Sequence, residues 1–229
     1  PVAETQAGKG SLPWDHPLNV GAIGVTGAPA ANALAADADL IIAVGTRLQD
    51  FTSGSHALFA SARLLSINVQ PVDAAKGRGS TLVADARVVL AALRPGNWQA
   101  DPAWTHRAKL LALEWNQRVT ALSTHDATGE LPYDAEVIGA VRDSAADSAS
   151  RDIVVCAAGT LPAELHKLWR TSMAGGYHVE YGYSCMGYEI AGGLGVKLAR
   201  PECEIIAMLG DGSYLMLNSE ISTSVMLKL

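Results

Sequence analysis

A carboxylate between two glycines, placed directly after a strand-like run, is the feature of the sequence best suited to chemistry. Residues 204–209 are expected to form a strand, and Gly210-Asp211-Gly212-Ser213 follows, with a helix expected immediately after it. A carboxylate at a strand end is a hard oxygen ligand for Mg²⁺, and the glycines let a diphosphate approach the backbone. The unpaired N–H groups of a helix start also attract anions. The pattern therefore predicts a metal–diphosphate socket, or in its simpler interpretation an ordinary Asp-Gly turn that caps a helix.

The elements that must position this turn form a repeated strand–helix pattern. Strands are expected at residues 153–156 and 204–209, and helices at 134–146, 162–170, 186–199 and from 214 to the last residue. Repeated β-α-β order implies parallel strands, and ligands of such sheets bind beyond the carboxyl ends of the strands. Gly159-Thr160 and the turn at residues 210–213 both follow strands, so we expect them to meet at one edge.

The first hundred residues repeat the same alternation. They predict strands at 40–44 (buried on both faces), 64–69 and 81–83, and helices at 28–36 and 85–93, the latter capped by Asp85. Apolar residues at helical spacing predict a long helix after residue 101, followed by a polar linker at 123–129. The fold class is thus α/β, with two three-layer parallel-sheet units. The predicted domains are a central Rossmann-like domain at 1–100, a helix and linker at 101–130, and a second domain at 131–229.

Composition restricts the classes of partner. The 229 residues carry a formal charge of −6, and the basic residues form no run, which disfavours nucleic acid and anionic membranes. Cys156, Cys185 and Cys203 are too widely spaced for a zinc site or a disulfide framework, so we expect reduced thiols in a cytoplasmic protein, with Cys185 buried. The start of the chain resembles neither a signal peptide nor a natural start, and the last helical stripe has no stop signal; we expect both ends to be cut.

Two weaker patterns have structural interpretations beside functional ones. The glycines at 21, 24 and 27 do not have the spacing of a dinucleotide fingerprint, and we expect a turn before the helix at 28–36. His178 and Glu180 belong to a loop expected to face the turn at 210–213, which makes them candidate substrate contacts. Met186 begins a stripe at four-residue spacing with Ile190, Leu194 and Leu198, which is also the pattern of core packing.

The combined order of these segments resembles one enzyme family. Residues 181–188, the glycine-rich helix at 189–195 and the strand that leads into Gly-Asp-Gly-Ser resemble the diphosphate-binding domain of thiamine-diphosphate-dependent enzymes related to acetolactate synthase. The first half resembles the central domain of the same enzymes, which in some members binds a nucleotide. Details of the chain are most similar to the trihydroxycyclohexane-dione hydrolases of myo-inositol breakdown, at residues 49–54, 68–71 and 180–189.

The resemblance implies roles for individual residues. Asp211 matches the Mg²⁺ ligand, and Gly210, Gly212 and Ser213 match the turn that contacts the diphosphate. The loop after the first strand of this domain, Gly159 and Thr160, matches a second diphosphate contact. Met186 matches the apolar residue that props the cofactor in a bent conformation. Ser184 matches the position whose backbone carbonyl accepts a hydrogen bond from the aminopyrimidine.

The implied function is hydrolysis of a C–C bond that opens a cyclic polyhydroxy diketone. The family's second metal ligand, an Asn, would fall after Leu229, and the catalytic Glu belongs to a pyrimidine-binding domain that this sequence lacks, so the implied catalytic residue is outside the chain, which alone should be inactive. Relatives imply a homodimer or homotetramer with active sites between subunits. Two alternatives stay open: a carboligase or decarboxylase of 2-oxo acids, and a non-catalytic nucleotide-binding module.

Overall fold

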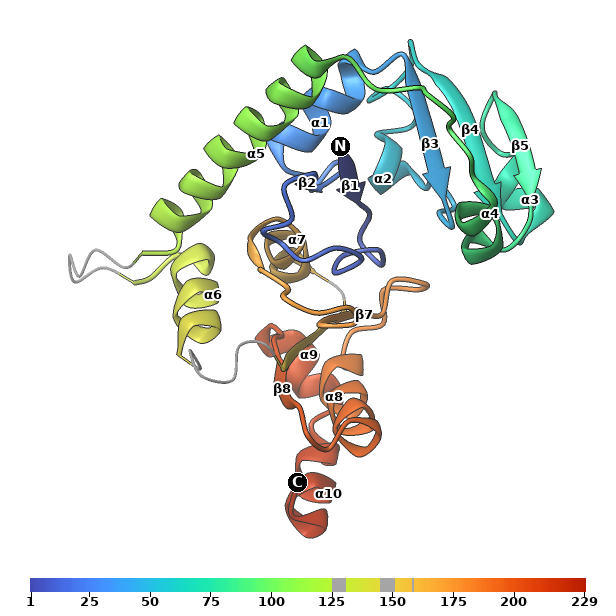
Figure 1. Ribbon diagram of the computed structural model, residues 1–229. Helices are drawn as coiled ribbons and strands as arrows, with labels where there is room; N and C mark the ends of the chain where they lie inside the picture. Colours follow the sequence, from blue (N-terminus) through green and yellow to red (C-terminus); the bar gives the residue numbers. More distant parts are fainter. Residues whose placement is uncertain (125–130, 145–150, 158) are drawn as a thin grey trace. The chain divides into compact units, whose positions relative to one another are not determined.

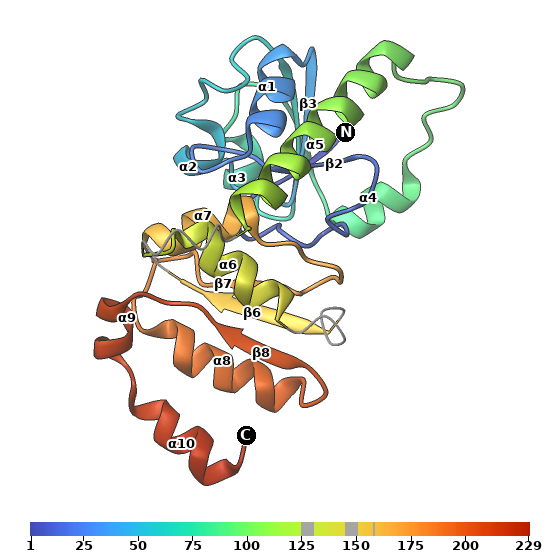
Figure 2. The ribbon, with the colours of Figure 1, turned by 90° about the vertical axis from the view of Figure 1, so that its left-hand side faces the viewer.

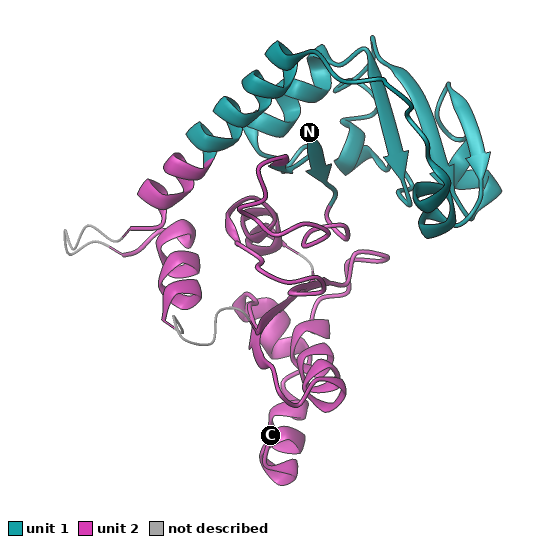
Figure 3. Cartoon of the chain, viewed as in Figure 1, with its two compact units in different colours: residues 1–5, 20–115 teal, residues 6–19, 116–229 magenta. Residues whose placement is uncertain are grey.

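The computed structural model describes residues 1–124, 131–144, 151–157 and 159–229, and these form two compact units (Figure 3). The first unit comprises Pro1–Thr5 and Val20–Trp115, and the second comprises Gln6–Asn19 and Asn116–Leu229. The grouping differs from the predicted domain ranges in two places: residues 6–19 join the second unit, and the division falls inside a helix. The predicted linker at 123–129 lies mostly outside the described residues, and the domain bounds stay a prediction.

The first unit contains a parallel three-stranded sheet, as the alternation predicted (Figure 1). Its order is β3 (Leu40–Val44), β4 (Arg63–Asn68), β5 (Ser80–Val83), with Leu40 opposite Arg63 and Leu65 opposite Ser80. The helices of this unit are α1 (Pro29–Asp37), α2 (Asp50–Ser53), α3 (Pro71–Ala75), α4 (Ala86–Ala92) and the first part of α5 (Pro102–Leu122). Two further strands, β1 (Val2–Glu4) and β2 (Asn19–Ala22), pair separately.

The prediction that the strand at 40–44 is buried on both faces was wrong. Ala43 packs into a core cluster with Ala35 and Leu64, but the alternate side chains Leu40, Ile42 and Val44 are 41%, 49% and 37% exposed. Successive side chains of a strand point to opposite faces, so one face of β3 contacts the core and the described residues leave the other face exposed. A continuous apolar run does not by itself reveal which of these faces is covered.

The glycine-rich segment before α1 is a tight turn, as predicted. Gly24 has a φ of 120°, and a Cβ at this position would lie 2.1 Å from the Phe51 carbonyl oxygen. The Asn32 side chain accepts from the Gly24 N–H at 3.0 Å and donates to the Gly24 carbonyl at 2.8 Å. The conformation therefore requires glycine, and α1 holds the turn in place.

The second unit contains a parallel sheet with the order β7 (Tyr177–Val179), β6 (Asp152–Cys156), β8 (Glu204–Ala207). Ile153 and Val155 form a core cluster with Cys203, and α8 (Tyr188–Ala199) packs over β6 and β8. The opposite face meets α7 (Thr160–Leu168), because the Tyr177 hydroxyl lies 3.3 Å from the Cys156 thiol and donates to the Pro162 carbonyl. The sheet thus has helices on both faces (Figure 2), and α6 (Asp134–Asp143) packs against α7.

Three element predictions in this unit need correction. β7 was expected to be part of a loop, and three residues are too few to give a strand pattern. The last helix is interrupted: α9 (Asp211–Met216) ends where Leu217 takes a φ of −150°, and α10 (Ser219–Leu227) begins after Asn218. α8 begins at Tyr188 rather than at residue 186, because Gly187 takes a left-handed φ of 91° and leaves Met186 in the preceding loop.

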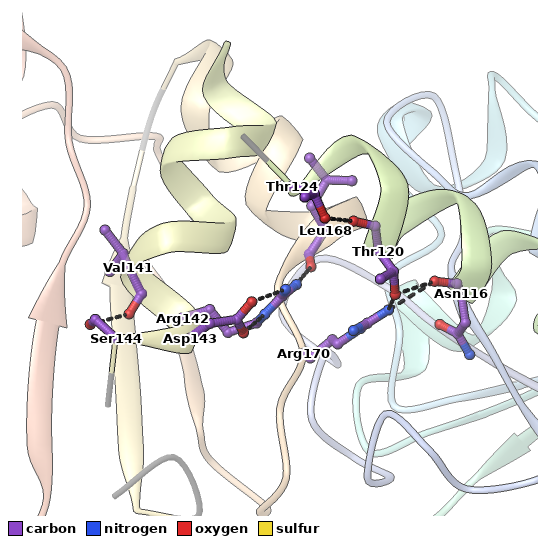
Figure 4. A network of polar contacts seen from close by, with 9 residues as sticks. All are labelled: Asn116, Thr120, Thr124, Val141, Arg142, Asp143, Ser144, Leu168 and Arg170. Atoms are coloured by element: carbon purple, nitrogen blue, oxygen red, sulfur yellow. Dashed lines mark hydrogen bonds and ion pairs between the residues drawn. The ribbon is translucent and has the colours of Figure 1, made fainter. Parts of the chain in front are cut away.

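A polar network joins the helices of the second unit (Figure 4). The Arg170 Nη2 donates to the Asn116 carbonyl and to the Thr120 hydroxyl, both at 2.8 Å, and its guanidinium lies 4.4 Å from the Trp14 ring centroid. Arg142 is buried and pairs with Asp143, whose pKa is lowered by the hydrogen bond from this guanidinium. Arg170 thereby connects the end of α5 and the segment 6–19 to the segment between α7 and β7. None of the described helices is long and apolar enough to cross a membrane.

Candidate cofactor site

The carboxyl ends of β6, β7 and β8 bring three loops together at one edge of the second sheet. In the parallel register Val155 lies opposite Ala207, and Cys156 lies opposite Val179. The chain leaves β6 toward Gly159-Thr160, leaves β7 toward residues 180–187, and leaves β8 toward residues 210–213. All the residues predicted to hold the diphosphate or the metal ion therefore follow adjacent strands at the same edge.

The turn after β8 presents the predicted metal ligand to solvent. The Met208 N–H donates to the Val155 carbonyl at 3.0 Å, which carries the strand pairing up to the start of the turn. Asp211 is the first residue of α9 and is exposed, whereas Ser213 is only 2% exposed. A Cβ at Gly210 would meet no atom within 4 Å, so the backbone here is open to a ligand. α9 has only six residues, so the metal ion and the open backbone, rather than a long helix dipole, would hold a diphosphate.

Met186 touches this turn from the neighbouring loop. Its Cε atom lies 3.1 Å from the position that a Cβ on Gly212 would take, and its side chain is 45% exposed. Gly212 therefore provides the space that the methionine side chain occupies. The alternative interpretation of Met186 as the start of a buried stripe was wrong, because the residue precedes α8 and Leu198 at the other end is mostly exposed.

The loop after β6 approaches the same edge. Gly159 has a φ of 107°, is exposed, and has no atom within 4 Å of a Cβ position. Thr160, the first residue of α7, is also exposed. The two residues offer backbone groups and one hydroxyl at a position that a diphosphate can reach without displacing a side chain.

The loop after β7 is held by a carboxylate whose role the sequence did not reveal. Glu180 accepts hydrogen bonds from the backbone N–H of Tyr183, at 3.0 Å to Oε1, and of Cys185, at 2.7 Å to Oε2. Between these donors Ser184 takes a left-handed φ of 54°. Donation from the Cys185 N–H is the largest cause that lowers the pKa of Glu180, so the group is a carboxylate at neutral pH.

The remaining candidates of this loop differ in their surroundings. The His178 Nε2 lies 2.5 Å from the Tyr188 hydroxyl, and the two rings stack. Substrate contact by His178 or Glu180 stays a prediction. Cys185 was expected to be buried, which was wrong: it is exposed, while Cys156 and Cys203 are buried and all three thiols are free. Residues 182–186 of this loop are all exposed, so its cysteine has no core to enter.

The available donors fit a hard cation that takes most of its oxygen ligands from the diphosphate, the backbone and water. Among the described residues no group of three or more His, Cys, Asp or Glu side chains could hold a metal ion. Asp211 would supply one carboxylate oxygen, and diphosphate oxygens, backbone carbonyls and water would supply the rest. Mg²⁺ is bound in this way at diphosphate sites, through one or two carboxylates and the phosphates themselves.

Comparison with known protein families agrees with this arrangement. Residues 1–93 match the family described as thiamine pyrophosphate enzyme, central domain, and residues 157–229 match the thiamine pyrophosphate enzyme, C-terminal TPP binding domain. The chain belongs to the thiamine pyrophosphate enzymes. Thiamine pyrophosphate is thiamine diphosphate, so the cofactor and both domain types predicted from the resemblance are confirmed. Every candidate residue from Gly159 to Ser213 lies within the second match.

Among individual proteins, the chain is similar to several that share one name. Over 98% of its length the chain is 44% identical to the 3D-(3,5/4)-trihydroxycyclohexane-1,2-dione hydrolase of Geobacillus thermodenitrificans. It is 41% identical to the protein of the same name from Clostridium perfringens and 39% identical to that from Bacillus cereus. The chain spans 38% to 39% of the length of these three relatives.

Proposed function

We propose that this chain is the cofactor-holding part of a thiamine-diphosphate- and Mg²⁺-dependent hydrolase that opens the ring of a cyclic polyhydroxy 1,2-diketone in myo-inositol degradation. The observation that carries the proposal is the meeting of Gly159-Thr160, Met186 and the Gly210-Asp211-Gly212-Ser213 turn at one sheet edge, in a chain 44% identical to such a hydrolase. The roles of the individual residues are part of the same proposal.

The exposed and open positions fit the proposed cofactor. Asp211 would bind Mg²⁺, and the backbone of Gly210, Gly212 and Ser213 would contact the diphosphate. Gly159 and Thr160 would approach the diphosphate from the other side, where no side chain interferes. Met186 would pack under the cofactor, since its half-exposed side chain already covers Gly212. The Ser184 carbonyl would accept a hydrogen bond from the aminopyrimidine group.

The chain's own contribution to the reaction is binding and orientation. When bound, thiamine diphosphate supplies the nucleophilic carbon and the electron sink that C–C cleavage requires. Cleavage between the two carbonyls with uptake of one water gives a carboxylic acid at one end of the opened chain and an aldehyde at the other, which balances the reaction. Asp211 and Met186 would fix the diphosphate and the ring system at the strand ends, so that the reacting atoms meet in one geometry.

The experiment that tests the substrate is product analysis on the full-length protein. Incubation with the cyclic dione, thiamine diphosphate and Mg²⁺ should yield the open-chain aldehyde acid, and omission of either cofactor should abolish the product. Incubation with pyruvate serves as the comparison. Formation of acetolactate or of a decarboxylated product, with the dione unchanged, would instead identify an enzyme that acts on 2-oxo acids.

Assembly and location are part of the same proposal. We propose a homodimer or homotetramer in which a second subunit completes each site, and a cytoplasmic location. Exposed apolar side chains near the cofactor edge support the assembly, among them Leu215 and Met216 on α9. Sedimentation of the full-length protein should give a species at least twice the mass of one chain, and a monomer at micromolar concentration would contradict this.

A further inference from the structure

We propose that Glu180 is a positioning residue that aims the backbone carbonyl of Ser184 at the aminopyrimidine group of thiamine diphosphate. This inference rests on the proposed function, because it concerns the same cofactor site. Both carboxylate oxygens of Glu180 accept hydrogen bonds from backbone N–H groups of the loop that carries Ser184. Glu180 would thus act through the backbone and need not touch the cofactor.

The geometry of the peptide bond makes the connection direct. The N–H of Cys185 and the carbonyl of Ser184 belong to one peptide group, and in a planar trans peptide these two bonds point in opposite directions. The Cys185 N–H points to the Glu180 Oε2, at an N···O distance of 2.7 Å. The Ser184 carbonyl must therefore point away from Glu180, as a carbonyl that serves an outside ligand has to do.

The second hydrogen bond fixes the chain just before Tyr183, one residue ahead of Ser184. The Tyr183 N–H donates to the Glu180 Oε1 at 3.0 Å, so the peptide groups before and after residues 183–184 are held by one carboxylate. Ser184 takes a φ of 54°, a left-handed conformation that is unfavourable for L-residues with a side chain. The two charge-assisted hydrogen bonds offset that cost and keep the loop in this conformation without the cofactor.

The backbone of Glu180 is itself anchored to the sheet. The Glu180 N–H donates to the Cys156 carbonyl at 3.1 Å, at the point where β6 and β7 end. The orientation of the Ser184 carbonyl is thereby tied to the strand ends from which Gly159-Thr160 also emerges. At the far end of the loop the buried Glu189 accepts the Gly187 N–H at 3.0 Å, so carboxylates hold both ends of residues 180–187.

Two cofactors that differ only in the aminopyrimidine group can show whether Glu180 orients the Ser184 carbonyl or only stabilises the loop. Oxythiamine diphosphate has an oxygen in place of the amino group and cannot donate the hydrogen bond in question. In the full-length protein with Mg²⁺, Glu180→Ala should weaken thiamine diphosphate binding about tenfold, the value of one well-placed hydrogen bond, and weaken oxythiamine diphosphate binding less than twofold. Glu180→Gln retains one acceptor oxygen and should lie between wild type and Glu180→Ala. Binding is measured by titration calorimetry.

The matched control is Glu202→Ala. Glu202 is exposed, pairs with Arg200 and lies before β8, away from the carboxyl ends of the strands. The Glu202→Ala substitution should leave the affinities for both cofactors unchanged. Equal weakening of the two cofactors by Glu180→Ala would show general loss of the loop and overturn the inference, as would unchanged binding of thiamine diphosphate. Failure of the wild-type protein to bind either cofactor in a Mg²⁺-dependent way would instead overturn the proposed function, so the two failures are distinguishable.

Discussion

Two thiols of the second unit, Cys156 and Cys185, have raised pKa values for different reasons. Burial raises the pKa of Cys156 to about 12, and the hydrogen bond to Tyr177 only partly opposes this. Loss of solvation, followed by the negative charge of Glu180, raises the pKa of the exposed Cys185. Because the thiolate is the reactive form, both groups react more slowly at neutral pH than an ordinary cysteine, for different reasons.

Alkylation should therefore follow exposure. With iodoacetamide at pH 8 we expect Cys185 to be modified first, and Cys156 to stay unmodified until the protein unfolds. The rate at Cys185 should rise with pH beyond 9, because its raised pKa keeps part of the thiol protonated there. Peptide mass spectrometry of timed samples measures both rates, with unfolded protein as the control. Modification of Cys156 as fast as Cys185 in the folded protein would contradict the assigned burial.

At the residue scale, sequence reasoning located Asp211 but missed the main interactions of Glu180. The position of Asp211 follows from a strand pattern and two glycines, which are local features. The hydrogen bonds of Glu180 depend on the left-handed conformation of Ser184, and a serine in the sequence does not predict that conformation. The acidic residue at the start of an exposed loop was the one available signal, and it suggested a substrate contact instead.

At the element scale, the turn before α1 and the helix α8 offer a matched pair of glycines. Gly24→Ala places a Cβ 2.1 Å from the Phe51 carbonyl oxygen at a φ of 120°, so it should lower the free energy of unfolding by about 2–4 kcal/mol. Gly195→Ala, inside α8 with no atom within 4 Å, should raise it by up to about 1 kcal/mol. Urea unfolding measures the free energy of unfolding of both variants. Equal effects of the two substitutions would contradict the tight turn at Gly24.

Arg170 tests how the elements of the second unit are joined. Arg170→Ala removes two hydrogen bonds to α5 and the contact with Trp14, so we expect a loss of about 2–4 kcal/mol in the free energy of unfolding. Arg200→Ala removes an exposed ion pair with Glu202, which solvent screens, and should lower the free energy of unfolding much less. Thermal unfolding of both variants gives the comparison. A loss from Arg170→Ala no larger than that from Arg200→Ala would refute the joining role.

The elements themselves were predictable where their patterns were long. The strand at Leu40–Val44 and the cap of α4 follow from an apolar run and from Asp85, whose carboxylate accepts the Val88 N–H as expected. The three-residue β7 and the interruption between α9 and α10 were not predictable, because neither changes the apolar period enough to be seen.

At the scale of the whole molecule, parallel β-α-β order determines where the candidate site lies. Once β6, β7 and β8 lie parallel in one sheet, their following loops must share an edge, which is why the sequence could predict that residues 159–160 and residues 210–213 follow strands at the same edge. It could not predict that residues 6–19 join the second unit, because that depends on contacts such as Trp14 with Arg170, far apart in the chain.

The central claim is that Asp211 holds Mg²⁺ for the diphosphate of the cofactor. The most direct measurement is titration calorimetry of thiamine diphosphate into the full-length protein, with Mg²⁺ and with chelator, for wild type, Asp211→Ala and the control Asp134→Ala. Asp134 is likewise an exposed first residue of a helix. We predict Mg²⁺-dependent binding in wild type and in Asp134→Ala, and its loss in Asp211→Ala. Unchanged Mg²⁺-dependent affinity in Asp211→Ala would contradict the account.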